Sequence, residues 1–339
     1  MNTGHIHPSA KKLIQKNTIH IPIATWAKQI RAGDISALAR AITLVESKNK
    51  DDQKMTSQLL RKCNIKNSST VRIGITGPPG VGKSSFIEAF GRFLLNETRS
   101  KLAVLTIDPS SPLQGGSILG DKTRMQSLAL DARVFIRPTP AGSNDGGIHL
   151  NTRESIQLCE SAGYNFILVE TVGVGQSSFS IHDVTDLTIL LIPPGGGDEL
   201  QGIKRGVTEI ADLIIVNKDD SGLEAQAKLT QGQYEQAMQL YPGKKVNVLR
   251  CSSTMTKGLK EIYAALNQLI TSKKKDWSKN RKFQTLKAFH HKIEYAWMNE
   301  WKRKMTSKPL IAIESIVLMN PSQMEDKVNT YISSLKKLK

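Results

Sequence analysis

The chain has 339 residues, of which 39% are hydrophobic and 23% are charged, and its formal net charge is +17. This length accommodates one large domain with additions or two domains, and the composition is typical of a soluble globular protein. No apolar run approaches the roughly 20 residues that a membrane-spanning helix needs, so we expect no membrane partner.

The cysteines and the positive charge indicate the cellular environment of the protein and the kinds of partner and metal site that it lacks. Cys63, Cys159 and Cys251 stand far apart without a Cys/His cluster, which favours a reducing, cytoplasmic environment and argues against a structural zinc or iron–sulfur site. The lysines and arginines are spread along the chain without interleaved aromatic residues, so no nucleic-acid partner is expected. Binding of nucleic acid stays open as an alternative because of the net charge alone.

The first 66 residues are expected to form an arm followed by a helical layer. Residues 1 to about 24 show no clear periodicity, as is common for a loosely held terminus. Asp34 has the residue type and position of an N-cap for a helix through Glu46, which carries apolar residues at helical spacing. A second helix is expected over residues 51–63, so that the two helices pack together ahead of the next segment.

Residues 67–275 alternate short β-rich runs with helical segments, which is the pattern of a doubly wound α/β domain. The runs are apolar and mostly do not alternate, as expected for strands of a mostly parallel sheet that is buried on both faces. The expected strands are Val71–Thr76, Lys101–Asp108, Arg133–Arg137, Phe166–Glu170, Leu187–Ile192, Leu213–Asn217 and Val246–Arg250. The expected helices are Ser84–Leu95, Arg153–Ala162, Leu200–Ala211, Leu223–Leu240 and Leu259–Ser272. Ligands of such domains bind at the carboxyl ends of the strands.

The run from Gly77 to Ser84 matches the phosphate-binding pattern G-x-x-x-x-G-K-[ST] between the first strand and a helix. Its glycines let consecutive backbone N–H groups surround phosphate oxygens, and the helix N-terminus adds positive potential. Lys83 is expected to reach the β- and γ-phosphates, and the Ser84 hydroxyl is expected to ligate Mg²⁺. The nucleotide-binding residues predicted in this segment are Gly77, Pro78, Pro79, Gly80, Val81, Gly82, Lys83, Ser84 and Ser85.

Two carboxylates end strands that we expect beside this loop. Asp108 ends the second strand and is a natural partner for the metal, directly or through water. Glu170 ends the fourth strand, where a carboxylate can hold Mg²⁺ or orient the attacking water. The amide of Gly173, which follows, is placed to sense the γ-phosphate. We therefore count Lys83, Asp108 and Glu170 as catalytic residues.

A charged loop with three consecutive glycines lies between residues 193 and 204 and runs into a helix. Such a loop beside the phosphates is a candidate moving element. Lys204 is the cation in it that we expect to reach anionic oxygens, and we count it among the catalytic residues.

The sixth strand is followed by Asn217-Lys218-Asp219-Asp220, an N-K-x-D pattern that reads guanine. The Asp220 carboxylate would accept from the N1 and exocyclic N2 donors, which adenine does not present, while Asn217 holds the loop and Lys218 lies across the base. A pocket built for those donors rejects the base that lacks them, so the nucleotide is expected to be GTP. Backbone contacts to the same base are expected after the seventh strand, from Ser252, Ser253 and Thr254.

Residues 276–339 indicate a helical extension. A long helix from Asp276 to Lys304 carries apolar residues at three- and four-residue steps, Pro309 ends it, and a last helix starts near Pro321. An apolar stripe outside the sheet domain indicates either a lid on its own core or an oligomer contact, and the spacing leaves both open.

As a set, these motifs resemble the MeaB / methylmalonic aciduria type A protein (ArgK) family of SIMIBI-class P-loop GTPases. The resemblance covers roughly residues 24 to 270 and rests on Leu38–Ser47, Gly77–Ser84, Asp108–Met125, Arg137-Pro138, Glu170–Ser177 and Gly197–Asp220. It implies a GTP-hydrolysing chaperone that gates adenosylcobalamin loading and protects methylmalonyl-CoA mutase or a related cobalamin-dependent mutase. Adenosylcobalamin would be bound only by that partner enzyme.

The resemblance also implies roles for residues. By position, the family's magnesium and switch residues look like Ser84, Asp108, Asp121 and Glu170, and its additional switch looks like the loop over residues 193–204. The family forms homodimers through C-terminal helices, which favours an oligomer contact for the extension. Where the family usually continues Gly-Gln-Ser-Glu, this chain has Ser178, so one switch carboxylate is missing.

Two other functions compete with this interpretation. The first is a P-loop kinase or ATPase linked to the transport of lysine, arginine or ornithine, and the pattern at residues 217–220 argues against its ATP. The second is a metal-insertion chaperone of the same GTPase branch, whose usual Cys/His ligands are absent from this sequence.

Overall fold

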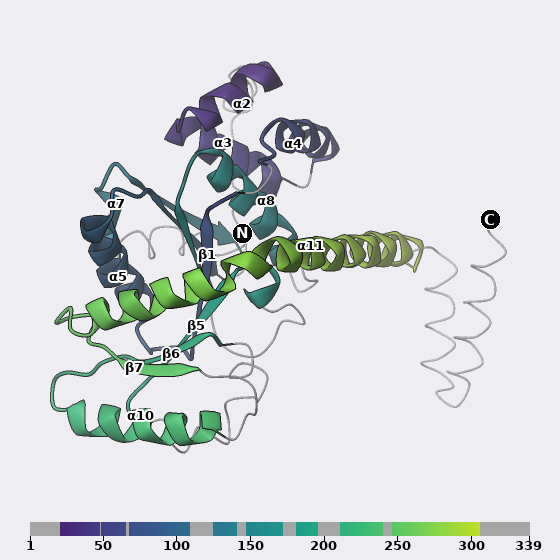
Figure 1. Ribbon diagram of the computed structural model, residues 1–339. Helices are drawn as coiled ribbons and strands as arrows, with labels where there is room; N and C mark the ends of the chain where they lie inside the picture. Colours follow the sequence, from purple (N-terminus) through teal and green to yellow (C-terminus); the bar gives the residue numbers. More distant parts are fainter. Residues whose placement is uncertain are drawn as a thin grey trace, which may run out of the picture. The chain divides into compact units, whose positions relative to one another are not determined.

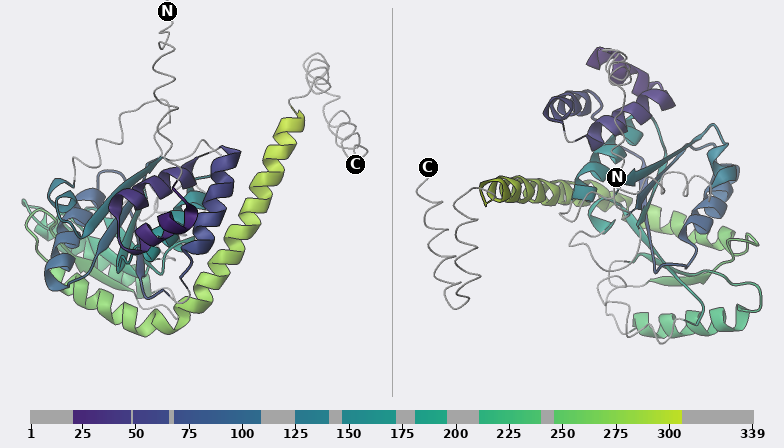
Figure 2. Two further views of the ribbon diagram at one scale, coloured as in Figure 1. Left: turned by 90° about the horizontal axis from the view of Figure 1, so that it is seen from above. Right: turned by 180° about the vertical axis from the view of Figure 1, so that it is seen from behind.

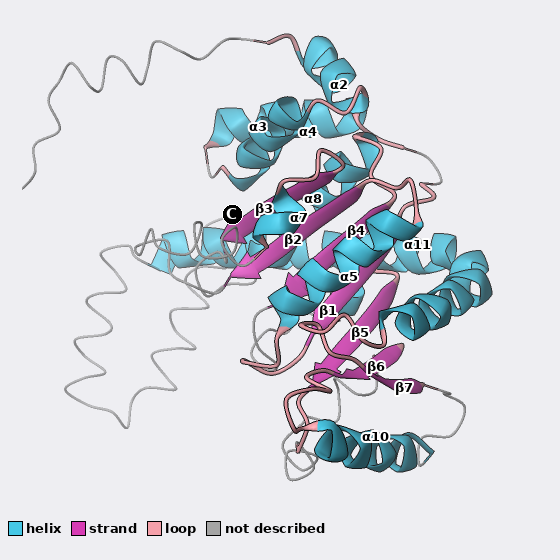
Figure 3. Cartoon of the chain, turned by 90° about the vertical axis from the view of Figure 1, so that its left-hand side faces the viewer, coloured by secondary structure: helices cyan, strands magenta, loops and turns pink. Residues whose placement is uncertain are grey.

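The computed structural model describes residues 21–47, 49–65, 68–108, 125–140, 147–171, 181–195, 211–239 and 246–305 (Figure 1). Seven strands form one sheet in the order β3-β2-β4-β1-β5-β6-β7, and every neighbouring pair in it is parallel (Figure 3). The strands are β1 Val71–Thr76, β2 Leu102–Asp108, β3 Val134–Pro140, β4 Phe166–Thr171, β5 Leu187–Ile192, β6 Leu213–Val216 and β7 Asn247–Arg250. The predicted parallel α/β fold is confirmed, and the first strand in the chain is the middle strand of the sheet.

The helices agree with the sequence pattern over most of the described residues. They are α2 Ile23–Arg31, α3 Ile35–Glu46, α4 Lys50–Lys62, α5 Lys83–Glu97, α7 Gln126–Ala129, α8 Gly147–Ser161, α10 Glu224–Gln239 and α11 Leu259–Met305, with a 3-10 turn η1 at Ile181–Asp183. The short elements α7 and η1 were not predicted. The helix predicted over residues 200–211 and the one after Pro321 lie outside the described residues. No described helix is both long and apolar enough to cross a membrane.

Side chains of one strand alternate between two cores. Leu102 and Val104 of β2 belong to the core that includes α5, α7 and the first turns of α11. Ala103 and Leu105 belong to the core formed with α2, α3, α4 and α8. Because successive side chains of a strand point to opposite faces, β2 is covered by helices on both sides, which explains its uninterrupted apolar sequence.

The N-terminal helices share the second of these cores with the sheet (purple in Figure 2). Asp34 caps α3 as predicted, since its Oδ1 accepts from the backbone N of Ala37 at 2.9 Å. Trp26 of α2 donates from Nε1 to the carbonyl oxygen of Ala37 at 3.0 Å, in a buried hydrogen bond that joins α2 to α3. The apolar stripe of α3 packs against α8, so this layer belongs to the sheet domain's own hydrophobic interior.

The helix α11 runs without interruption from Leu259 to Met305, so the two helices predicted over residues 259–272 and 276–304 are one. The predicted break at the three lysines 273–275 is wrong because lysine is a good helix former. Lys273 is in addition held by an ion pair with the Asp212 carboxylate, just before β6. By compactness the chain divides into Met1–Lys282 and Phe283–Lys339, while the three-part division at residues 66 and 275 stays a prediction.

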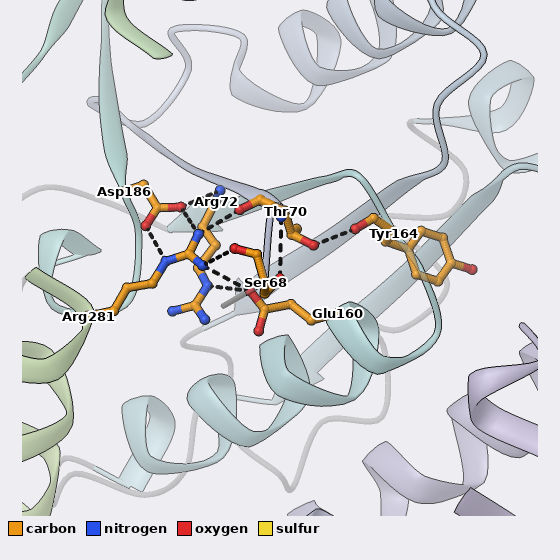
Figure 4. A network of polar contacts seen from close by, with 7 residues as sticks. All are labelled: Ser68, Thr70, Arg72, Glu160, Tyr164, Asp186 and Arg281. Atoms are coloured by element: carbon orange, nitrogen blue, oxygen red, sulfur yellow. Dashed lines mark hydrogen bonds and ion pairs between the residues drawn. The ribbon is translucent and has the colours of Figure 1, made fainter. Parts of the chain in front are cut away.

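A network of buried charges ties α11 to the amino end of the sheet (Figure 4). Arg281 pairs with both oxygens of Asp186, which precedes β5, at 2.7 Å from Nε and 2.6 Å from Nη2. Arg72 of β1 donates from Nε to Oε1 of Glu160 on α8 at 2.9 Å. The Arg281 guanidinium also donates to the carbonyl oxygens of Ser68 (2.9 Å) and Thr70 (2.6 Å). The network therefore joins α11, α8 and β1 to the residue before β5, at the end of the sheet opposite the phosphate-binding loop.

Candidate functional site

The loop after β1 has the geometry that the glycine pattern predicts. Gly82 has a φ of +92° and caps the N-terminus of α5, and a Cβ at this position would lie 2.8 Å from Nδ2 of Asn217. A Cβ on Gly77 would lie 2.4 Å from the carbonyl oxygen of Leu191 in β5. Both positions therefore require glycine, and the loop presents the N-terminus of a 15-residue helix to whatever binds above β1.

Lys83 is buried, with 8% of its surface exposed. Its ammonium donates to the carbonyl oxygens of Gly77 at 2.9 Å and Pro78 at 3.0 Å. Burial lowers the pKa of Lys83, and the nearby charge of Glu170 opposes this shift. The ammonium thus lies against the carbonyl groups of the same loop, at the position where a phosphate-binding lysine belongs.

A hydroxyl and a carboxylate meet beside this lysine. Ser84 donates from Oγ to Oε1 of Glu170 at 3.2 Å, and Glu170 is buried at the end of β4. The contact follows from the sheet order, because β4 is a direct neighbour of β1 and pairs Glu170 with Ile75. Serine hydroxyl and carboxylate oxygens are ligands that Mg²⁺ accepts, so this pair fits the predicted metal position.

The other residues predicted to contact the phosphates or the metal lie wholly or partly outside the described structure. Asp108 is the last residue of β2, the strand next to β4, but its side chain lies outside the described part of the structure. Asp121, Gly173 and Lys204 all lie outside the described residues.

Asn217 joins three segments that are far apart in the sequence. It is 2% exposed, and its Nδ2 donates to the carbonyl oxygen of Val81 in the phosphate loop at 2.9 Å. Its Oδ1 accepts from Ser253 Oγ at 2.8 Å and from Cys251 Sγ at 3.3 Å. The sequence predicts that Asn217 holds its own loop, and the structure shows that it also connects the phosphate loop to the segment after β7.

Asp220 faces the same segment after β7. Its Oδ2 accepts from the hydroxyl of Ser252 and from Thr254 Oγ1, the latter at 2.7 Å. These hydrogen bonds, led by that from Ser252, hold the pKa of Asp220 below its ordinary value, so the group is a carboxylate at neutral pH. Lys218 is exposed on the same loop, with a φ of +63°. The predicted base-reading residues therefore lie together, two strands from the phosphate loop.

Sequence reasoning missed Asp219, which it treats as the variable position of the pattern. Asp219 is buried and pairs with Arg250 at 3.1 Å and with Lys257 at 3.0 Å. The signal in the sequence was weak, since two adjacent aspartates do not reveal which of them faces the protein. Both partners are distant in the sequence: Arg250 is 31 positions (250 − 219) and Lys257 is 38 positions (257 − 219) further along the chain. They come close to Asp219 only because β6 and β7 pair in the sheet.

Comparisons with known proteins give a consistent result. The family model described as "Methylmalonyl Co-A mutase-associated GTPase MeaB" matches residues 38–306. The GTPase ArgK of Escherichia coli is 40% identical over 293 residues, which cover 85% of this chain and 85% of that protein. The mitochondrial methylmalonic aciduria type A homolog of Mus musculus is 44% identical over 250 residues, which cover 70% of this chain and 60% of that protein's length. A crystal structure titled as a LAO/AO transport system kinase aligns with a TM-score of 0.69 at 31% identity, covering 91% of this chain and 97% of that one.

Proposed function

Since the chain belongs to the family of methylmalonyl-CoA mutase-associated GTPases, we propose that it is a chaperone whose GTP hydrolysis gates adenosylcobalamin loading of a cobalamin-dependent acyl-CoA mutase and protects that enzyme. The chain is a GTPase of this family. The observation that carries the proposal is the extent of the family match, from residue 38 to residue 306. It includes most of α3 and all of α11, which lie outside the nucleotide-binding segments.

The nucleotide of the proposed cycle is GTP, bound between the phosphate loop and the Asn217–Asp220 segment. The hydrogen bond from Asn217 to Val81 supports this placement, because it sets the distance between the phosphate side and the base side of the site. Lys83 exchanges its contacts with Gly77 and Pro78 for phosphate oxygens when the nucleotide enters.

Magnesium belongs to this proposal through the residues that fit it. Ser84 and Glu170 would hold the ion, with Asp108 and Asp121 as further carboxylates, and bound Mg²⁺ would neutralise charge on the phosphates. The amide of Gly173 and the ammonium of Lys204 complete the phosphate side as proposed contacts. Among the described residues, the hydrogen bond between Ser84 and Glu170 supports this assignment.

A homodimer is the second part of the proposal. Six large apolar side chains of α11 are exposed by 48–68%, and they recur at steps of one, three or four residues: Phe283, Leu286, Phe289, Ile293, Trp297 and Met298. Residues three and four apart share one side of a helix, so most of this set forms an apolar face of the second compact unit. A second copy of the same helix is the occupant that would remove this face from water. We also propose a cytoplasmic location, because the three isolated cysteines indicate a reducing environment.

The proposal is tested with the full chain and the purified cobalamin-dependent mutase of the same host. We expect the two proteins to co-purify with a strength that differs between GDP and a non-hydrolysable GTP analogue. The Lys83→Ala variant, which should not hydrolyse GTP, is expected to stop the transfer of adenosylcobalamin to the apo-mutase. Absence of any nucleotide-dependent association would refute the chaperone function while leaving the GTPase activity untouched.

One alternative is suggested by the structural similarity to the LAO/AO transport system kinase. A kinase would move the γ-phosphoryl group to an acceptor, whereas a GTPase releases it as inorganic phosphate. Incubation with γ-labelled GTP separates the two, and label that remains on a protein or amino acid would favour the kinase.

A further inference from the structure

We infer that Asp219 is a positioning residue for base recognition, because its carboxylate holds both ends of the loop that carries the hydrogen-bond partners of Asp220. This inference rests on the proposed function, in which the Asn217–Asp220 segment reads guanine. The segment over residues 251–257 is called the β7 loop below.

The carboxylate of Asp219 is a buried anion between two cations. Its side chain is 2% exposed, Oδ1 lies 3.1 Å from Arg250 Nη1, and Oδ2 lies 3.0 Å from Lys257 Nζ. Its backbone N also donates to the carbonyl oxygen of Cys251 at 2.9 Å. The two cations compensate the buried carboxylate, and the backbone hydrogen bond adds a third contact to the same loop.

The two cations stand at opposite ends of the β7 loop. Arg250 is the last residue of β7, directly before the loop, and Lys257 is its final residue. Ser252 and Lys257 close the loop by two backbone hydrogen bonds, N to O in each direction, both of 3.1 Å. One carboxylate therefore fixes where the loop begins and where it ends.

The β7 loop holds the side chain of Asp220 by two hydrogen bonds. The Ser252 hydroxyl and Thr254 Oγ1 both donate to Asp220 Oδ2. Asp219 thus acts on its neighbour through the β7 loop as well as through the backbone. We expect movement of the loop to change the direction in which the Asp220 carboxylate points.

The backbone around Asp219 needs this support. Lys218 and Ser221 have φ angles of +63° and +55°, a region that residues with a side chain rarely adopt. Such conformations persist only where the surroundings hold them in place. On the other side, Arg250 is fixed by a hydrogen bond of 2.8 Å from its Nε to Gln231 Oε1 on α10, so the anchor itself is rigid.

The test compares Asp219→Asn with a matched control, Asp212→Asn. Both aspartates are buried and lysine-paired, but Asp212 precedes β6 and Asp219 follows it, so only Asp219 adjoins the base-reading residues. Calorimetric titration of the full chain with GDP and with IDP gives the readout, because hypoxanthine lacks the exocyclic amino group that guanine offers to Asp220. We expect Asp219→Asn to weaken GDP binding about tenfold and to lower the GDP/IDP affinity ratio at least threefold, whereas Asp212→Asn lowers the melting temperature and leaves that ratio unchanged.

A second variant keeps the inference testable if Asp219→Asn does not fold. Lys257 is 57% exposed, so Lys257→Met should fold normally, and we expect it to lower the GDP/IDP ratio about twofold. An unaltered ratio in every Asp219 and Lys257 variant that folds would overturn the positioning role. Equal binding of GDP and ADP by the unsubstituted chain would instead overturn the base-reading function itself, and the inference with it.

Discussion

Replacing Asn217 by alanine should weaken nucleotide binding and the fold together, because this side chain connects three loops. The substitution removes the hydrogen bonds to the Val81 carbonyl (2.9 Å), from Ser253 (2.8 Å) and from Cys251 (3.3 Å). The bonds to Val81 and from Ser253 contribute about 1 kcal/mol each, whereas the bond from Cys251 contributes little because a thiol is a weak donor. We expect a loss of about 2 kcal/mol in the free energy of unfolding.

The same contacts hold the phosphate loop in its position relative to the base-reading segment. We therefore expect the substitution to weaken nucleotide binding by a similar free energy. A change of about 2 kcal/mol corresponds to roughly 30-fold in the dissociation constant of GDP. Calorimetric titration measures this constant, and urea unfolding measures stability.

Thr70→Val is the matched control for Asn217→Ala. It removes one buried hydrogen bond, from Thr70 Oγ1 to the Tyr164 carbonyl at 2.7 Å, at the amino end of the sheet. We expect this control to lower stability by about 1 kcal/mol and to leave GDP affinity unchanged. An Asn217→Ala protein that is destabilised but binds GDP as tightly as the unsubstituted chain would refute the linking role.

Three further substitutions address other parts of the molecule. Asp220→Asn is expected to move the preference from GTP towards xanthosine triphosphate, measured by phosphate release, and an unchanged preference would contradict the base-reading assignment. Arg281→Met leaves the buried Asp186 carboxylate without its cation and should lower the free energy of unfolding by about 3–5 kcal/mol in urea, whereas the exposed Arg92→Met should cost less than about 0.5 kcal/mol. Trp297→Asp should convert the proposed dimer to a monomer in light scattering, and Lys274→Asp on the same helix should not.

The sheet was predictable to a large extent because its strands are short apolar runs. The bounds of β1 and β5 agree with the prediction at both ends, since each run is buried throughout, β1 is followed by Gly77, and β5 lies between Asp186 and Pro193. The order of the strands was not predictable from the pattern, because it depends on which strands pair. The contact of Ser84 with Glu170 needs that order, as it joins residues 86 positions apart.

Two features that the sequence analysis interpreted wrongly have a common physical cause. The lysines at residues 273–275 look like a linker in sequence, but they continue α11 because lysine has no intrinsic preference against a helix and Lys273 finds Asp212 as a partner. Asp219 looks like the variable position of a motif, but it is buried and paired with the last residue of β7 and with Lys257 of the β7 loop. In both cases the deciding partner is distant in the chain, and local pattern carries no information about it.

The order of the strands also bears on how the protein is made. β1 emerges from the ribosome first of the seven strands, yet it lies between β4 and β5, where Val71 pairs with Phe166 and Ile73 with Leu187. Because pairings between distant segments are slow to form, β1 and its glycine loop must wait unpaired for much of synthesis. A nascent chain that has not yet reached Asn217 lacks the hydrogen bond from this residue to the Val81 carbonyl. In the proposed site, guanine nucleotide contacts both the phosphate loop and the Asn217–Asp220 segment, so we expect it to stabilise completed chains by mass action.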